Sequence, residues 1–189
     1  MNIFVLSTDP IEAAVQQCDK HVPKMAVESG QMLSTAHRVL DGKLTRRPSK
    51  SGKTMVKYWE MDSEVESIYY KAVHVGHPCT KWSMESDSNY RWHWEHMKAL
   101  LKEYTYRYGK IHKTEKELLW QIQDPPRNIP KGPMTPFKLA MQANPECMAL
   151  KDPVQAYRAF YQTKQYRFPM VWSKRTVPEW FQYADLHAA

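Results

Sequence analysis

The feature that most constrains the fold is a run of regularly spaced aromatic and apolar residues in the middle of this 189-residue chain. Its members alternate in steps of four and three residues: Tyr90, Trp94, Met97, Leu101, Tyr104 and Tyr108. An α-helix has 3.6 residues per turn, so these steps predict a helix over 89–108 with the aromatic stripe in the core. Gly109, directly after the last member, is typical of a helix C-terminus.

A second periodic segment carries polar side chains on one stripe of a helix. The members follow at steps of three and four residues: His21, Lys24, Glu28, Gln31, Thr35 and Arg38. Pro23 can open this helix, and an apolar face lies beside the polar one. Glu28 falls at the edge of the polar stripe, where partial burial would suit a carboxyl group to acid–base chemistry. We therefore interpret Glu28 as a candidate acid/base residue, with His21 and Lys24 beside it.

Other local signals complete a mainly α fold. A capping residue precedes proline at residues 9–10, 135–136 and 152–153, which predicts three further helix starts. Thr114 begins a capping box, residues 63–73 form a shorter helical pattern, and an extended segment ending at Leu6 has no obvious partner strand. We expect one compact helical domain over residues 1–189, with long ordered loops.

The balance of charge favours a polyanionic partner. The chain has 27 Lys and Arg against 20 Asp and Glu, a net charge of +7. Residues 43–57 contain six cations and no acidic residue, together with Gly52 and several Ser and Thr, and we interpret them as a mobile basic loop.

Aromatic residues interleave with cations in several segments, a mixture that stacks bases and holds phosphates in nucleic-acid grooves. Core packing explains many of these aromatics equally well. The predicted nucleic-acid contacts are Lys20, Arg38, Arg46, Arg47, Lys50, Lys53, His77, Trp82, Asn89, Trp92, Arg107, Lys110, Tyr157, Arg158 and Tyr161.

The three cysteines indicate a reducing compartment because they are odd in number and far apart. The N-terminus lacks the features of a signal peptide, and no apolar stretch approaches the ~20 residues of a membrane span. We expect a cytoplasmic protein that does not enter a membrane. Cys18 and His21, with His77 and Cys79, have metal-ligating side chains but lack the regular spacing of a zinc finger. We predict neither a metal nor a cofactor.

A set of motifs spans most of the chain: Cys18-Asp19-Lys20-His21, Lys24, Glu28, Leu33-Ser34-Thr35-Ala36-His37, His77-Pro78, Trp82, Asn89-Tyr90 and the run from Glu103 to Lys110. Together these motifs resemble a family of small phage and marine-virus proteins, which would place the chain in a host cytoplasm.

Further features are Asp19-x-His21, a glutamate seven residues later, a His-led segment entering a long helix, and a late aromatic–basic cluster at residues 157–161. In these features the chain faintly resembles the pyrimidine-dimer DNA glycosylase/lyase of T-even phages. The resemblance implies a compact all-helical enzyme whose N-terminal amine attacks the deoxyribose C1′ while the glutamate handles protons. Glu28 would be that glutamate, and His21 a substrate contact.

The family exposes a small second residue after Met removal, whereas Asn2 is a poor substrate for that trimming. The nucleophile is therefore the Met1 amine, a lysine such as Lys24, or water. The sequence thus predicts an enzyme that binds damaged or modified DNA and acts at the glycosidic bond. The alternatives are a non-catalytic phage module that binds nucleic acid or a host protein, and a metal-dependent nuclease. The sequence leaves open whether the chain forms oligomers.

Overall fold

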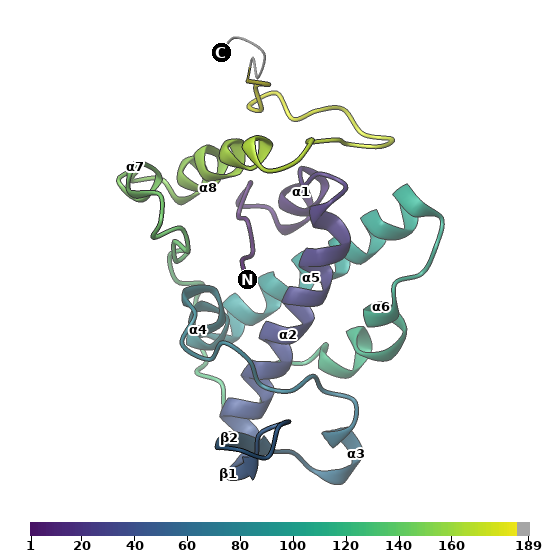
Figure 1. Cartoon of the computed structure of the whole chain (residues 1–189), viewed down its shortest axis with the longest axis vertical. Coiled ribbons are helices and arrows are strands. Elements are labelled where there is room, and N and C mark those ends of the chain that lie inside the picture. Colours follow the sequence, from purple (N-terminus) through teal and green to yellow (C-terminus); the bar gives the residue numbers. More distant parts are fainter. Residues whose placement is uncertain (185–189) are drawn as a thin grey trace.

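Two long helices, α2 (His21–Asp41) and α5 (Asp87–Tyr108), pack against each other and form the centre of the molecule (Figure 1). A computed structural model describes residues 1–184. α5 begins where the Ser86 hydroxyl accepts a hydrogen bond from the Asn89 amide at 3.1 Å, and it ends at Gly109, whose φ of 66° is left-handed. The prediction of this helix from its aromatic spacing is confirmed, with the start two residues earlier.

Shorter elements surround the two long helices. In chain order they are α1 (Pro10–Val15), β1 (Lys43–Pro48), β2 (Met55–Glu60), α3 (Ser63–Glu66), α4 (Pro78–Glu85), α6 (Lys113–Glu117), the 3₁₀ turn η1 (Leu119–Ile122), α7 (Pro145–Met148), α8 (Pro153–Gln162) and the 3₁₀ turn η2 (Thr163–Tyr166). α1 packs on α5, and α4 packs on both α2 and α5. The fold is therefore compact and mostly helical, as the sequence predicts.

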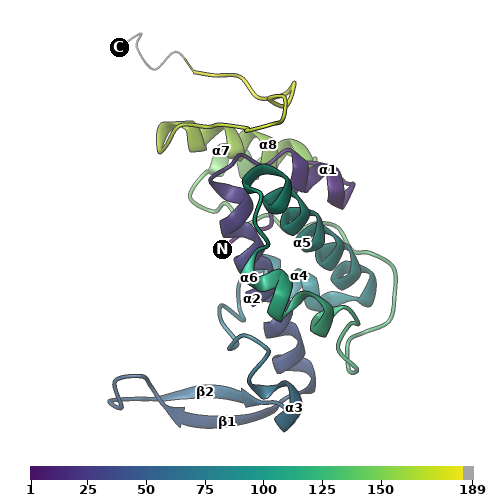
Figure 2. The ribbon, with the colours of Figure 1, turned by 90° about the vertical axis from the view of Figure 1, so that its right-hand side faces the viewer.

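The predicted mobile basic loop is instead part of an antiparallel hairpin. β1 pairs with β2 from Lys43 opposite Glu60 to Pro48 opposite Met55, and Gly52 takes a left-handed φ of 72° in the connecting turn. The hairpin projects from the body on the side where the N-terminus lies (Figure 2). The interpretation as a loop was wrong because the charges of residues 43–57 obscured the strand-forming Val56 within the segment and Tyr58 and Trp59 directly after it.

Helix starts follow the capping signals only in part. Asp9 and Asp152 cap α1 and α8 through their carboxylates, as predicted. Residues 135–136 start no helix, because Thr135 is instead hydrogen-bonded to Asn89 and Glu85. α6 begins one residue before Thr114, with His112 as its cap, and α3 is much shorter than the predicted 63–73 helix. α2 begins at His21, ahead of Pro23.

Within residues 1–184, no helix has both the length and the apolar character that crossing a membrane requires.

Candidate active site at the N-terminus

The first residues of the chain are fixed inside the protein. Residues 3–6 are all buried, and the Asn2 side-chain amide donates to the Ala140 carbonyl at 3.1 Å. The Asn2 side-chain oxygen accepts a hydrogen bond from the Phe4 amide at 3.0 Å, while Phe4 adopts a left-handed φ of 56°. Such a conformation costs a non-glycine residue of the order of 1–3 kcal/mol and persists only where the surroundings impose it. Because chain termini are usually poorly ordered, this anchoring is a distinctive feature.

The anchored terminus brings the Met1 amine to the carboxylate of Glu28. The Met1 nitrogen lies 3.6 Å from Glu28 Oε2, and the Asn2 amide donates to the same oxygen at 2.9 Å. The other oxygen, Oε1, lies 3.7 Å from Lys24 Nζ. The Glu28 side chain is only 14% exposed, whereas that of Lys24 is 62% exposed. The Met1 amine and the shielded Glu28 carboxylate, which are 27 residues apart in the sequence, therefore lie in one site.

These groups line a cavity of about 210 Å³ between the N-terminal segment, α2 and the end of α8. The aromatic rings of Phe4, Phe160 and Phe168 form part of its wall. The cavity also contains residues that the sequence analysis did not select, Lys164 and Arg167. The only sequence signal near them was the late aromatic–basic cluster at residues 157–161, from which neighbouring residues were selected instead.

His21 lines the same cavity as a neutral side chain. Burial, followed by the positive charges of Lys24, Lys164 and Lys20, lowers the pKa of His21 to about 3. Its Nδ1 lies 2.7 Å from the Tyr161 hydroxyl, which already accepts a hydrogen bond from the Cys18 amide. The hydroxyl proton is thus free to be donated to Nδ1, which favours the tautomer with hydrogen on Nε2. In that tautomer, Nε2–H is the ring donor left free for a ligand.

His77 lies near the same terminus. Its Nδ1 accepts a hydrogen bond from the Cys79 amide at 3.2 Å and caps α4. Partial burial and then the positive N-terminus lower the pKa of His77. The structure therefore brings the four predicted catalytic residues, Met1, His21, Lys24 and Glu28, around one cavity, with His77 close by.

The predicted nucleic-acid contacts separate into surface and interior residues. Six are exposed: Lys20, Arg46, Arg47, Lys50, Lys53 and Lys110. His77 and Arg158 are partly exposed. Four of the exposed residues belong to the hairpin and its turn, which form the most concentrated positive charge among the predicted contacts.

The other seven predicted contacts are interior residues, and their selection as surface contacts was wrong. They are Arg38, Trp82, Asn89, Trp92, Arg107, Tyr157 and Tyr161. Their polar atoms are used inside the protein. Arg107, for example, binds Asp19 and Glu103 and two backbone carbonyls, and the Tyr157 hydroxyl donates to the Lys138 carbonyl. Sequence spacing does not distinguish a stacking platform from a core aromatic, because both lie on apolar faces.

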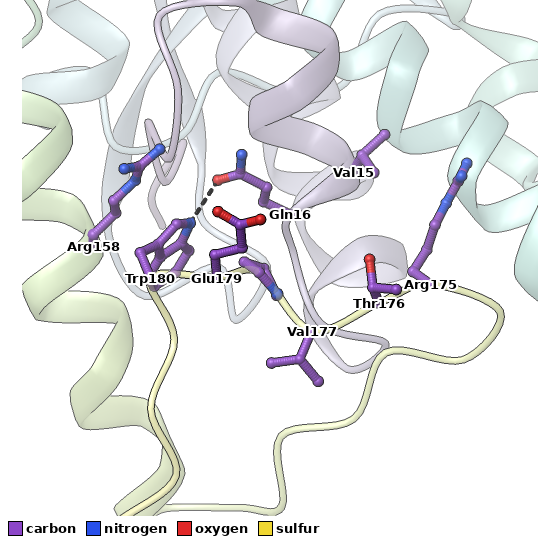
Figure 3. Close-up of a pocket in the computed structure, with 9 residues that line it drawn as sticks. Val15, Gln16, Arg158, Arg175, Thr176, Val177, Glu179 and Trp180 are labelled. Atoms are coloured by element: carbon purple, nitrogen blue, oxygen red, sulfur yellow. Dashed lines mark hydrogen bonds between the residues drawn. The ribbon is translucent and has the colours of Figure 1, made fainter.

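A second hollow of about 450 Å³ lies where the C-terminal segment passes α1 and α8 (Figure 3). Trp180 Nε1 donates to Gln16 Oε1 at 2.8 Å along its wall, and Arg158 and Arg175 stand on opposite sides. Arg158 Nε donates to the Leu6 carbonyl, and Arg175 is paired with Glu103. Glu179 adds a carboxylate. This hollow contains no pairing of a nucleophile with an acid/base group comparable to that of Met1 and Glu28.

Cysteine chemistry does not contribute to the candidate site. Cys18, Cys79 and Cys147 are buried and unpaired by disulfides, and burial raises the pKa of each thiol. Over the described part of the chain, no group of three or more His, Cys, Asp or Glu side chains is arranged to hold a metal ion.

Comparisons of the chain with protein-family models, curated proteins and solved structures found no match.

Proposed function

We propose that this protein is a DNA glycosylase with associated lyase activity, in which the Met1 amine is the nucleophile and Glu28 is the acid/base residue. The observation that supports this most strongly is the 3.6 Å approach of the N-terminal amine to a shielded carboxylate inside a cation-rich cavity. A primary amine acts as a nucleophile when a neighbouring base takes its proton, and the Glu28 carboxylate lies in position to do so for Met1.

The reaction begins when the neutral amine attacks C1′ of the deoxyribose. The C1′–N bond breaks, and the base leaves with its electron pair and takes up a proton from water. The attacking nitrogen gives a proton to Glu28, and the sugar ring opens to an iminium when Glu28 passes that proton to O4′. The Glu28 carboxylate then takes a C2′ proton, which expels the 3′ phosphate and cuts the strand. Water hydrolyses the iminium and restores the amine, so Glu28 accepts and returns protons across the cycle.

The β1–β2 hairpin supplies binding to the DNA backbone in this proposal. Arg46, Arg47, Lys50 and Lys53 are exposed, and the hairpin projects on the side of the N-terminus (Figure 2). Cations at this density neutralise phosphates and release counterions, which makes binding depend steeply on salt. A base must leave the duplex stack before C1′ is reached, and this costs a few kcal/mol, least at damaged or mismatched pairs.

The test is borohydride trapping on a duplex oligonucleotide that contains one abasic site. The wild-type protein is expected to form a covalent adduct, and peptide mapping should place that adduct on the Met1 amine. Glu28→Gln keeps an acceptor for the Asn2 amide, and we expect it to slow trapping by about 10²- to 10⁴-fold while DNA affinity stays within a few-fold. Glu64→Gln, at an exposed carboxylate on α3, is the matched control and should trap at the wild-type rate.

Three results would contradict the proposal. An absence of any adduct with the wild-type protein would remove amine chemistry and favour the non-catalytic binding module. Equal loss of trapping, DNA binding and thermal stability in Glu28→Gln would show that the glutamate only holds the N-terminus in place. An adduct on Lys24 would transfer the nucleophile to that side chain.

A further inference from the structure

Lys164 is a buried cation without an anionic partner. Its residue is 8% exposed, and within residues 1–184 its ammonium forms no ion pair and no hydrogen bond. Its Nζ lies 3.4 Å from the centre of the Phe160 ring and 5.9 Å from that of Phe4. The ammonium is not sealed in the core, because Lys164 lines the cavity and its Nζ faces that space. A shielded cation that faces a cavity without an anionic partner points to a ligand that enters the cavity.

The electrostatic surroundings of Lys164 are positive. Burial comes first among the causes that lower the pKa of Lys164 to about 8, followed by the charges of Arg167 and Lys24, while the Cys147 thiol acts in the opposite direction. The cavity lining has four cationic groups: the Met1 amine, Lys24, Lys164 and Arg167. Its one carboxylate, Glu28, is already contacted by Met1, the Asn2 amide and Lys24. The cavity thus carries an excess of positive charge that an anion would balance.

The size of the cavity limits the anion. A volume of about 210 Å³ is smaller than the roughly 300–1,000 Å³ of sites that enclose drug-sized ligands. It fits a deoxyribose with one phosphate better than a complete nucleotide. The aromatic wall of Phe4, Phe160 and Phe168 suits the apolar face of a sugar, and the cations suit phosphate oxygens.

We propose that Lys164, with Arg167 and Lys24, binds a backbone phosphate next to an abasic deoxyribose in this cavity. The inference rests on the proposed function, because it places that phosphate beside the sugar that the Met1 amine attacks. Lys164 is then a substrate-binding residue, distinct from the hairpin cations that contact DNA farther along the duplex.

The test measures binding to a duplex that contains a tetrahydrofuran abasic analogue, which has no C1′ aldehyde and cannot form an iminium. Lys164→Met is expected to weaken binding about 10- to 100-fold, the loss of a hydrogen bond to a charged group. It should also reduce the slope of log K against log salt by about 0.9, one phosphate contact. Lys164→Arg should restore most of the affinity. Lys116→Met, at an exposed lysine on α6, removes the same charge away from the cavity and should have little effect.

Thermal unfolding adds a readout that separates binding from a structural role. Methionine relieves an unpaired buried charge, so Lys164→Met should be at least as stable as the wild-type protein although it binds DNA less tightly. Wild-type affinity in Lys164→Met, or a loss no larger than that of Lys116→Met, would overturn the inference. So would a borohydride adduct on Lys164 itself, because the residue would then be the nucleophile. Failure of the wild-type protein to form any adduct overturns the amine chemistry alone, since binding to the analogue is measured without it.

Discussion

Replacement of Arg38 by methionine should destabilise the protein strongly, although the sequence pattern suggested a DNA contact. The side chain is 1% exposed, and its guanidinium donates five hydrogen bonds. Four go to the backbone carbonyls of Trp59, Glu66, Tyr69 and Tyr70 at 2.8 Å, and one goes to Glu66 Oε2 at 3.0 Å. Arg38 thus joins the end of α2 to β2, α3 and the following segment.

The cost of the substitution follows from what it leaves behind. Methionine has no donor, so the four carbonyls lose their partner, while the Glu66 carboxylate keeps the Tyr58 hydroxyl and the Met61 amide. An acceptor left buried and unsatisfied costs about 1–3 kcal/mol, so we expect a total loss of the order of 3–5 kcal/mol. A protein of this length loses roughly 2–4 °C in Tm per kcal/mol, so Tm should fall by about 6–20 °C. The total free energy of unfolding of most proteins is about 5–15 kcal/mol, so part of the molecules would unfold at physiological temperature.

The assay pairs thermal unfolding with DNA binding at several salt concentrations. Arg46→Met is the matched control, because Arg46 is an exposed cation on the hairpin eight residues later. Its free energy of unfolding should change by less than about 0.5 kcal/mol, while its DNA affinity and salt slope decrease. The reasoning is refuted if Arg38→Met unfolds within about 1 kcal/mol of the wild type, or if it loses DNA affinity while its stability is unchanged.

Two further predictions concern pH. Burial lowers the pKa of His21 and His96 to about 3 and that of His37 to about 4, so the unfolded chain binds more protons than the native protein below pH 6.5. Stability should fall as the pH falls from 6.5, by about 2 kcal/mol per histidine at pH 5; a flat urea midpoint between pH 7 and 5 would contradict this. Binding of the abasic analogue, measured by fluorescence anisotropy, should weaken above pH 8 as Lys164 loses its proton. Lys164→Arg should remove that weakening because arginine stays charged. An equal decline in both proteins would assign the effect to another group.

The sequence predicted the helical core because periodicity reports directly on which face of a helix is buried. The 89–108 stripe and the capping signals at Asp9 and Asp152 are local features, and each corresponds to an observed helix. The hairpin was not predicted, because cations on both exposed faces mask any alternation of apolar and polar residues along β1 and β2. The helix start predicted at residues 135–136 is absent because Thr135 is hydrogen-bonded to Asn89 and Glu85. This is a tertiary interaction that no local sequence pattern reveals.

The candidate site could be predicted only in part. Lys24 and Glu28 are four residues apart on one helix, so their proximity follows from spacing. Met1 was suggested by resemblance alone, and its approach to Glu28 depends on how residues 2–6 are buried. Lys164 lies in η2 and Arg167 directly after it, more than 130 residues from Glu28 in sequence, so only the tertiary structure brings them to the cavity.

Three costly features meet at this one cavity. Phe4 adopts a left-handed backbone, Lys164 is buried without an anion, and the Met1 amine is fixed against Glu28 rather than free in solvent. Locally unfavourable conformations and unpaired charges are expected where a protein keeps a reactive site. Their convergence on one sugar-sized cavity is therefore a stronger argument for chemistry at the N-terminus than any of the three features alone.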